Sequence, residues 1–482
     1  MVQEQQVPET EEQSSTLSEQ ATEHLDLPQT DVHLSKDYVQ ALQRALKHED
    51  QDKLLEMLEE LHSADVADLL EVISSGMREK LISFIEENFD SEVTAEVLSE
   101  IEGEAQDDLY EQMSNDKIAD AVTEMETDDA VYVIEELDDD DREEVMRKLA
   151  ADDRVAIEES LSYPEDSAGR LMQREIVAVP EFWTVGQTID YLRSDNADIP
   201  SDFYNVFVVD PAHRLVGVVP LSRVMRTPRA SAVSEVMDTE PYFVKIDADQ
   251  EEVAYQFTKY HLISAAVVDE GQRLVGVVTV DDVVDVIEEE AEEDILALAG
   301  VRDESGLNES FVEITKGRFA WLIVNLGTAI LASMVIGMFE ATIEQMVALA
   351  VLMPIVASMG GNAGTQTMTV AVRAIATKEL SSTNAMRTVA REGSAAFLNG
   401  VMLAIVSGVV AVLWFDNVVL GGVFAVAMVF NVFVAGLCGL LVPMALYKLE
   451  IDPAISSSVF VTTITDVVGF FVFLGLAAAF LL

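Results

Sequence analysis

The stretch VFVVDPAHRLVGVVPLSRV (206–224) recurs 59 residues later as AAVVDEGQRLVGVVTVDDV (265–283). In both copies the VVD and LVGVV runs are rich in β-branched residues and are separated by a short polar segment, which is typical of two strands in a hairpin. Upstream, Leu171-Met172 is echoed by Val236-Met237. Each copy therefore predicts the order strand, helix, strand, strand, helix, and residues 164–290 are predicted to form two similar α/β units.

This doubled pattern resembles a tandem pair of CBS domains, which are regulatory modules that often bind adenine nucleotides. The resemblance implies that Thr279 and Asp282, in the pattern Gly276-x-x-Thr279-x-x-Asp282, bind the ribose of a nucleotide, with ATP as a regulatory ligand. The first copy has Pro220 and Arg223 at these places, so at most one such site is intact. An alternative is that Thr279 and Asp282 only cap the helix that follows.

The end of the second copy runs into a strongly acidic segment. Nine of the residues from Asp281 to Asp294 are Asp or Glu. At helical spacing, Asp281, Asp285, Glu288 and Glu292 share one stripe, and like charges so placed destabilise a helix by a few tenths of a kcal/mol per pair. Divalent cations would relieve this repulsion, although a solvated acidic face is an alternative.

The charge of the chain is divided unevenly. Of the net −58, residues 1–315 carry −57, with 22 Lys+Arg and 79 Asp+Glu, whereas residues 316–482 hold 7 and 8. So acidic a region excludes a nucleic-acid partner, because phosphate binding requires a basic surface. It favours cations as partners, although solubility or a salty habitat would explain much of the charge equally well.

Five apolar stretches in the back part are each long enough to cross about 30 Å of hydrocarbon. They lie near 319–339, 346–372, 393–415, 418–446 and 454–482. This part has seven basic residues, and all of them lie in three segments: before the first stretch, between the second and third, and between the fourth and fifth. Those three segments are therefore predicted to be cytoplasmic. The sequence thus predicts a multi-pass protein of a bacterial inner (plasma) membrane, with a cytoplasmic N-terminus and an external C-terminus.

Two polar features interrupt the apolar stretches. Asp466 lies twelve residues into the last stretch, near the middle of the bilayer, where a carboxylate is expected to face water or a cation. The run Gly360–Gln366, GGNAGTQ, is expected to weaken its helix and to line a cavity. The alternatives are an Asp466 hydrogen bond between helices and close helix packing through the glycines.

The ligand types in this membrane part favour a hard cation. Residues 316–482 contain no histidine and one cysteine, whereas sites for zinc, copper or nickel use His, Cys or clustered Met. Carboxylate, amide and carbonyl oxygens suit Mg²⁺, which retains much of its water. A carboxylate from each of two subunits is expected to hold the hydrated ion about a shared axis.

The front of the chain divides into two parts. Residues 1–35 are rich in Gln, Glu, Ser and Thr and are predicted to be a disordered tail. Residues 36–163 are predicted to be an acidic domain of helical repeats, because a similar amphipathic segment recurs. The copies are LHSADVADLLEVI (61–73), FDSEVTAEVLSEI (89–101), MSNDKIADAVTEM (113–125), METDDAVYVIEEL (125–137) and LAADDRVAIEESL (149–161).

Taken together, the chain resembles the MgtE family of magnesium transporters over nearly all of its length after residue 36. The matching segments are Tyr163–Gly169, Asp249–Val253, Glu293–Ile295, GGNAGTQ, Asp452–Ala454 and Thr465–Val467. The resemblance implies a homodimeric channel in which Asp466, Asn362, Gly361 and Gly364 form the ion pathway. It places regulatory Mg²⁺ sites on Asp249, Glu251, Asp281, Asp285, Glu288, Glu290, Glu293 and Asp294. Thr365 and His261 depart from residues that family members often have.

The predicted architecture is therefore multidomain: an all-α helical-repeat domain, a CBS pair, a connecting helix over 291–317 and a five-helix transmembrane domain over 318–482. The predicted function is Mg²⁺ transport across the bilayer that closes when cytoplasmic Mg²⁺ binds the acidic region, and no enzymatic activity is expected. Two alternatives remain, a proton- or Na⁺-coupled transporter of divalent cations and a CBS-based membrane sensor that does not transport.

Overall fold

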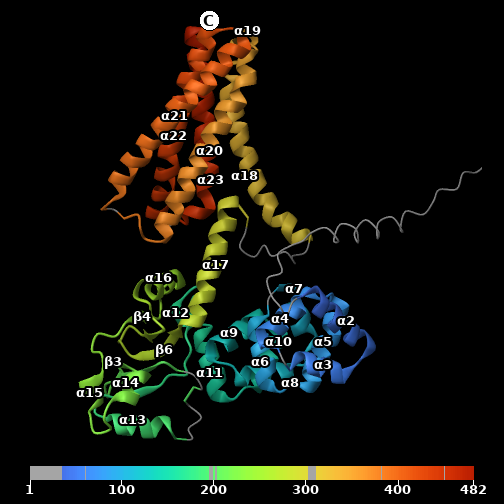
Figure 1. The fold of residues 1–482 in the computed structure, drawn as a ribbon, viewed down its shortest axis with the longest axis vertical. Coiled ribbons are helices and arrows are strands. Elements are labelled where there is room, and N and C mark those ends of the chain that lie inside the picture. Colours follow the sequence, from blue (N-terminus) through green and yellow to red (C-terminus); the bar gives the residue numbers. More distant parts are fainter. Residues whose placement is uncertain are drawn as a thin grey trace, which may run out of the picture. The chain divides into compact units, whose positions relative to one another are not determined.

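The structure is a computed structural model that describes residues 35–59, 61–101, 103–194, 199–200, 203–301, 311–381, 383–449 and 451–481. The chain forms two compact units, residues 1–163 and 164–482. The predicted tail, residues 1–35, lies outside the described residues except for Ser35, which caps the first described helix. Figure 1 shows the elements of both units.

The first unit consists of short helices, as predicted from the recurring amphipathic segments. They are α2 (Lys36–His48), α3 (Gln51–Leu58), α4 (Ser63–Val72), α5 (Ser75–Asn88), α6 (Ser91–Glu100), α7 (Gly103–Gln112), α8 (Asn115–Glu124), α9 (Thr127–Glu136), α10 (Asp139–Lys148) and α11 (Ala151–Ser160). Helices two positions apart in sequence pack together, α4 on α6, α6 on α8 and α8 on α10. The apolar positions form one continuous core, in which Leu69, Leu98 and Ile134 are fully buried.

The second unit begins with the CBS pair, whose two halves have the predicted order of elements. The first half contains α12 (Ala168–Leu171), β1 (Ala178–Pro180), α13 (Val185–Leu192), β2 (Asn205–Val209), β3 (Leu215–Pro220) and α14 (Leu221–Arg226). The second contains α15 (Val233–Val236), β4 (Phe243–Lys245), α16 (Gln250–Tyr260), β5 (Ser264–Val268), β6 (Leu274–Thr279) and α17 (Val280–Ala299). In each half a parallel pair of strands is followed by an antiparallel hairpin.

The leading segment of each half packs on the sheet of the other half. Met172 lies against Gly276, and Met237 lies against Gly217, so a side chain at either glycine would clash with the methionine sulfur. The backbone also pairs across the two halves, since Gln173 in the first half forms a β-bridge with Val277 in the second. The echo of Leu171-Met172 by Val236-Met237 therefore reflects two equivalent contacts across the pair.

Within the described residues of the membrane part, five helices are long and apolar enough to cross a bilayer. This part comprises α18 (Phe311–Gly337), the short α19 (Glu340–Gln345), α20 (Ala348–Ala376), α21 (Ala385–Phe415), α22 (Val418–Lys448) and α23 (Pro453–Phe480). The five predicted spans are confirmed as helices, but α21 begins eight residues before its apolar stretch. Arg387 and Arg391 therefore lie on a helix and not in the loop, because helix formation continues past the end of the apolar segment.

Two expectations about the backbone are wrong. The glycine-rich run does not break its helix, since α20 continues from Ala348 to Ala376. Gly360 and Gly364 instead allow close packing: a side chain at Gly360 would clash with Asn431, and one at Gly364 would come within 2.6 Å of Val461. Within its described residues the expected connecting helix over 291–317 is not continuous, because α17 ends at Gly300, which adopts a left-handed conformation with φ 71°. Residues 302–310 of this segment lie outside the described residues.

Candidate ion pathway and acidic cluster

The helix α20 carries a polar face that is exposed in the single chain. Its members recur at helical spacing and are Ser358, Asn362, Thr365, Gln366 and Thr369. Such a face is unfavourable against acyl chains, so it is expected to meet water or another protein surface. The predicted pathway residue Asn362 lies on it, as does Thr365, which contributes a hydroxyl group.

The helix α23 packs beside α20 and brings Asp466 to the same depth. Asp466 is half-buried and lies thirteen residues after Pro453, about 20 Å along the helix. Asn362 lies fourteen residues before the end of α20, about 21 Å from that end. The two helices touch here, because Gly364 lies directly against Val461 and close to Thr465. The pathway residues predicted from the sequence are thus brought together on two adjacent helices.

The two predicted pathway glycines differ in their surroundings. A side chain at Gly361 would meet no heavy atom within 4 Å, whereas Gly364 is buried in the contact between α20 and α23. Gly361 therefore leaves open space beside the polar face, and Gly364 sets the spacing of the helices.

A buried amide side chain on α22 packs against both α20 and α23. Asn431 is fully buried, and its Nδ2 donates a hydrogen bond of 2.8 Å to the carbonyl oxygen of Val356 on α20. Gly360 and Gly469 provide the room for this side chain on α20 and α23. Sequence reasoning missed Asn431, although a lone Asn inside an apolar span was a signal that could have identified it.

Half of the predicted regulatory residues converge on one acidic cluster. Glu251 at the start of α16 lies near Asp249 and near Glu290 and Asp294 on α17. Partial removal from water, followed by repulsion from these carboxylates, raises the pKa of Glu251. The pKa of Glu290 is raised for the same reasons, although Gln250 Nε2 donates to its Oε1 at 2.9 Å and opposes the change.

The cluster extends beyond the predicted residues. Partial burial and then the charge of Asp452, the N-cap of α23, raise the pKa of Asp294. Asp166 adds to the repulsion on Glu290. Asp166 and Asp452 lie in segments that carry the family resemblance, but the sequence alone indicates no role for either residue. We use the name acidic cluster for Asp166, Asp249, Glu251, Glu290, Asp294 and Asp452.

The other predicted regulatory residues lie elsewhere on α17. Asp281, Asp285 and Glu288 form an exposed stripe, in which partial burial and then Asp281 and Glu288 raise the pKa of Asp285. Glu293 is half-buried near the end of α17. His261 caps the opposite end of α16, about 18 Å from Asp249, and so does not join the acidic cluster.

The acids do not form a closed metal site. Among the described residues, no three His, Cys, Asp or Glu side chains are placed to hold one ion directly. This spacing fits mutual repulsion between carboxylates, and it fits a cation that binds through its own water ligands.

The proposed nucleotide residues make a helix cap. Thr279 Oγ1 donates to Asp282 Oδ2 at 2.6 Å, and the two residues form a capping box at the start of α17. Burial is the largest cause of the raised pKa of Asp282. The capping alternative is therefore realised in the structure.

One basic side chain links the membrane helices to the CBS pair. Lys378, two residues after the end of α20, pairs with Glu252 on α16 and lies 4.4 Å from the ring centre of Tyr255. The hydrogen bond from Lys378 is the largest cause that lowers the pKa of Glu252. From the sequence alone, Lys378 indicates only which side of the membrane its segment faces.

Comparison with known proteins agrees with this architecture. The family description "Divalent cation transporter" matches residues 353–476, "MgtE intracellular N domain" matches 61–166, and "CBS domain" matches 168–229 and 233–289. The magnesium transporter MgtE of Thermus thermophilus is 37% identical over 323 residues, which are 67% of this chain and 71% of the relative. That of Bacillus subtilis is 32% identical over 326 residues, 68% of this chain and 72% of the relative.

Among solved structures, the cytosolic domain of the Mg²⁺ channel MgtE in complex with ATP is similar at 33% identity and a TM-score of 0.47. The match covers 52% of this chain and 99% of that one. Because both relatives are more than 30% identical over two thirds of this chain and the domain descriptions match, the chain belongs to the MgtE family of magnesium transporters. These are multi-pass membrane proteins with intracellular N-terminal domains, and they are not enzymes.

Proposed function

We propose that this magnesium transporter works as a homodimeric channel of a bacterial plasma membrane, which closes when cytoplasmic Mg²⁺ binds its acidic cluster. The observation that carries the proposal is that α23, which bears Asp466, packs against α20, which bears the exposed polar face. A carboxylate at this depth attracts a dication, and amide and hydroxyl groups replace hydrogen bonds that a hydrated ion makes in water.

The proposed pathway requires a second copy of the chain. In the single chain the polar face of α20 is exposed and Asp466 is only half-buried. Two copies that meet through these faces enclose them between proteins and place two carboxylates about one axis. This arrangement removes the polar face from lipid and leaves a pathway with a charge of −2 for a hydrated Mg²⁺ ion.

Closure is proposed to depend on α17, because it lies between the CBS pair and the membrane helices within the second unit. Glu290 and Asp294 on α17 share the acidic cluster with Glu251 on α16 and Asp452 on α23. Mg²⁺ at the cluster neutralises the repulsion and favours the arrangement in which α16, α17 and α23 are close. When Mg²⁺ is low, the carboxylates repel and the arrangement loosens, so the population shifts toward an open pathway.

The exposed stripe of α17 supplies further proposed sites. We propose that Asp281, Asp285 and Glu288 of this stripe attract additional ions, together with the half-buried Glu293 near the end of α17. Several weak sites then act together. Each ion then needs only a modest preference for the closed state.

ATP is a proposed second regulator. A similar cytosolic domain was crystallised with ATP, which supports a nucleotide site near Thr279 and Asp282. In this chain both side chains already form the cap of α17, so nucleotide binding would act on the first turn of the helix that carries the acidic cluster.

The decisive experiment is Mg²⁺ flux in liposomes that contain the purified chain. Flux that follows only the Mg²⁺ gradient and the membrane potential supports a channel. Flux that stops when ionophores dissipate a proton or Na⁺ gradient would replace the channel by a coupled transporter. Membership of a transporter family argues against the sensor that does not transport, and measurable flux would exclude it.

A further inference from the structure

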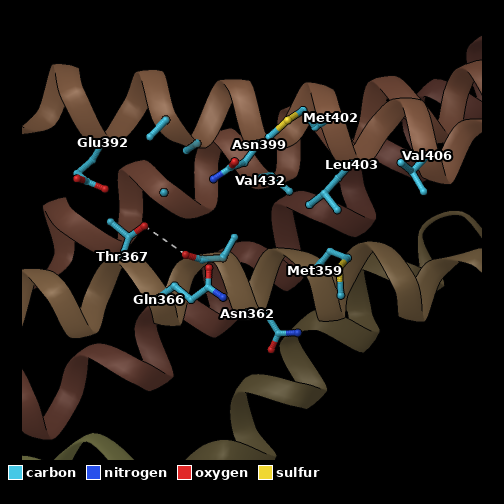
Figure 2. A pocket seen from close by; sticks show the side chains of 14 residues that line it. Met359, Asn362, Gln366, Thr367, Glu392, Asn399, Met402, Leu403, Val406 and Val432 are labelled. Carbon is cyan, nitrogen blue, oxygen red and sulfur yellow. Dashed lines mark hydrogen bonds between the residues drawn. The ribbon is translucent and has the colours of Figure 1, made fainter.

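A cavity of about 460 Å³ lies between α20 and α21, away from the acidic cluster. Both helices pack along α22 but make few contacts with one another, and Val432 and Gly436 of α22 form its floor. Figure 2 shows the labelled side chains of α21 on one side of the cavity and those of α20 on the other. We call this cavity the side groove.

The wall formed by α21 has two chemically different ends. Glu392 and Asn399 lie two helical turns apart on the same face, with the small residues Ala395 and Ala396 between them. Farther along the same face the lining becomes apolar, with Met402, Leu403 and Val406. The polar end is the end near the start of α21, which the basic residues place on the cytoplasmic side.

The wall formed by α20 is shared with the ion pathway. Gln366 and Asn362 line the side groove and also belong to the polar face of α20. Along their helices, Asn399, Asn362 and Asp466 lie about 20 Å from the helix ends that face the cytoplasm. The polar end of the side groove therefore extends from the depth of Asp466 to Glu392, which lies about 10 Å from the start of α21.

The lining excludes acyl chains and anions as natural occupants of the polar end. Among the described residues, the side chains of Gln366, Glu392 and Asn399 make no hydrogen bond or ion pair. Amide and carboxylate groups left unsatisfied against lipid are costly. The lining contains no Lys, Arg or His, so nothing in it attracts a phosphate headgroup.

The size and chemistry fit a hydrated divalent cation. At roughly 30 Å³ per water molecule, six waters occupy about 180 Å³, so the side groove has room for an ion with its octahedral shell. The amide oxygens of Gln366 and Asn399 are placed to accept hydrogen bonds from such a shell, and Glu392 supplies the charge.

We propose that the side groove is a water-filled branch of the ion pathway, in which Glu392 and Asn399 hold hydrated Mg²⁺ on its way between Asp466 and the cytoplasm. This inference rests on the proposed channel function. It gives each protomer its own exit, which leaves the shared axis near Asn362 and does not pass between Asp294 and Asp452. The branch still shares Asp466 and Asn362 with the axial route, so closure that acts at these two residues stops flux through both.

Accessibility to a charged thiol reagent tests whether the side groove contains water. In a Cys438→Ala background, which removes the single native cysteine, Asn399→Cys and Glu392→Cys are expected to react with a cationic methanethiosulfonate in proteoliposomes. Leu398→Cys is the matched control, because Leu398 is exposed on another face of α21 and is not part of the lining. Mg²⁺ is expected to slow the reaction at 399 more than Na⁺ does at equal ionic strength.

An unreactive cysteine at position 399 would show that lipid or protein covers the side groove and would overturn the proposal. Reaction without protection by Mg²⁺ would also overturn it, because the side groove would then contain water but no cation site.

Flux measurements separate this branch from the main pathway. Glu392→Gln is expected to lower Mg²⁺ flux roughly tenfold, because a charged residue at the entrance of a cleft changes the local cation concentration on that scale. Leu403→Trp, which fills the side groove, and Asn399→Leu, which changes little volume, are expected to do the same. Glu379→Gln, an exposed acid in the loop after α20, serves as the control and should leave flux unchanged.

Parental flux in both Glu392→Gln and Asn399→Leu would overturn the branch and leave the channel standing. Parental flux in Asp466→Ala would instead overturn the pathway through Asp466, whatever the side groove variants do.

Discussion

The ammonium group of Lys378 pairs with the carboxylate of Glu252 and lies 4.4 Å from the ring centre of Tyr255. Lys378 follows the last turn of α20, the helix that carries Asn362, and Glu252 is on α16, the helix that begins at the acidic cluster. The contact therefore connects the ion pathway directly to the CBS pair, by a route that does not use α17.

Removing this contact is expected to weaken closure. Both side chains are partly exposed, so the ion pair contributes at most about 1 kcal/mol, and the ring adds a similar amount. Lys378→Met should therefore raise the Mg²⁺ concentration at half-closure by roughly two- to fivefold in flux measurements on proteoliposomes.

A double-mutant cycle tests whether the contact itself is responsible. Glu252→Gln should have a similar effect, and the double variant should be little worse than either single one. Additive effects would mean that the two residues act separately. Arg373→Gln, on the exposed side of α20, is the matched loss of one positive charge.

Asp466→Ala is expected to abolish Mg²⁺ flux while the protein still folds, because the change removes a charge from the membrane and no packing group. Asp466→Asn should lose most of the flux as well, since a neutral amide attracts a hydrated dication far less. Asp416→Asn, a matched change in the loop between α21 and α22, should transport like the parent. Near-normal uptake by the Ala variant would rule out the proposed pathway.

The raised pKa values of Glu251, Glu290 and Asp294 predict how stability depends on pH. Their ordinary values are 4.5, 4.5 and 3.8, and each pKa is higher in the folded chain. Without Mg²⁺, at a pH above these ordinary pKa values, the folded state thus binds more protons than the unfolded state. The free energy of unfolding therefore falls as pH rises through this range. Mg²⁺ binds the ionised carboxylates, so its stabilising effect should grow over the same range.

Thermal melts of the full chain in detergent, recorded between about pH 4.5 and pH 8 with EDTA or with excess Mg²⁺, check this prediction. The two curves should diverge as pH rises. If NaCl at equal ionic strength reproduces the effect of MgCl₂, the acids are merely solvated and the closure mechanism fails.

Asp282→Ala is expected to remove the capping box of α17 and to lower stability by about 1 kcal/mol without any nucleotide. If ATP also binds there, calorimetry on the parent should detect it at millimolar concentration, and the variant should bind more weakly. Thr127→Ala, at a helix start in the other unit, gives a comparable loss of a polar side chain away from the CBS pair. An absence of heat in the parent would leave Asp282 with its capping role alone.

Gly439→Ala should destabilise the membrane helices by about 1–3 kcal/mol and reduce flux, because overpacking displaces α20. An added methyl group would lie 2.6 Å from the carbonyl oxygen of Gly364 and 3.0 Å from Thr367. Gly422→Ala on the same helix meets no atom within 4 Å and is the matched control. Equal melting temperatures for the two variants would contradict the close contact of α20 and α22.

The sequence predicted best those elements that have a strong period or a long apolar run. The CBS strands follow from two near-copies, and the five spans follow from hydropathy. The unbroken α20 could not be predicted from helix propensity, because the cost of Gly360, Gly361 and Gly364 is offset by packing against other helices.

The candidate site was predictable as a set of residues but not as an arrangement. Asp466 and Asn362 could be selected because polar groups are rare in spans. Nothing local in the sequence places Asp294 near Asp452 or Lys378 near Glu252, since these pairs are far apart in the chain. The side groove was missed for the same reason, because it depends on the divergence of α20 and α21.

The length of α17 has a mechanical consequence. Its 20 residues make a rigid rod of about 30 Å whose first turn is fixed to β6 of the CBS pair. By simple leverage, a tilt of about 10° at that end displaces the far end by about 5 Å, nearly the height of one helical turn. A small rearrangement of the CBS pair, too small to alter its own core, would thus become a larger displacement where α17 meets α23. The CBS pair therefore needs to move very little to affect the membrane helices.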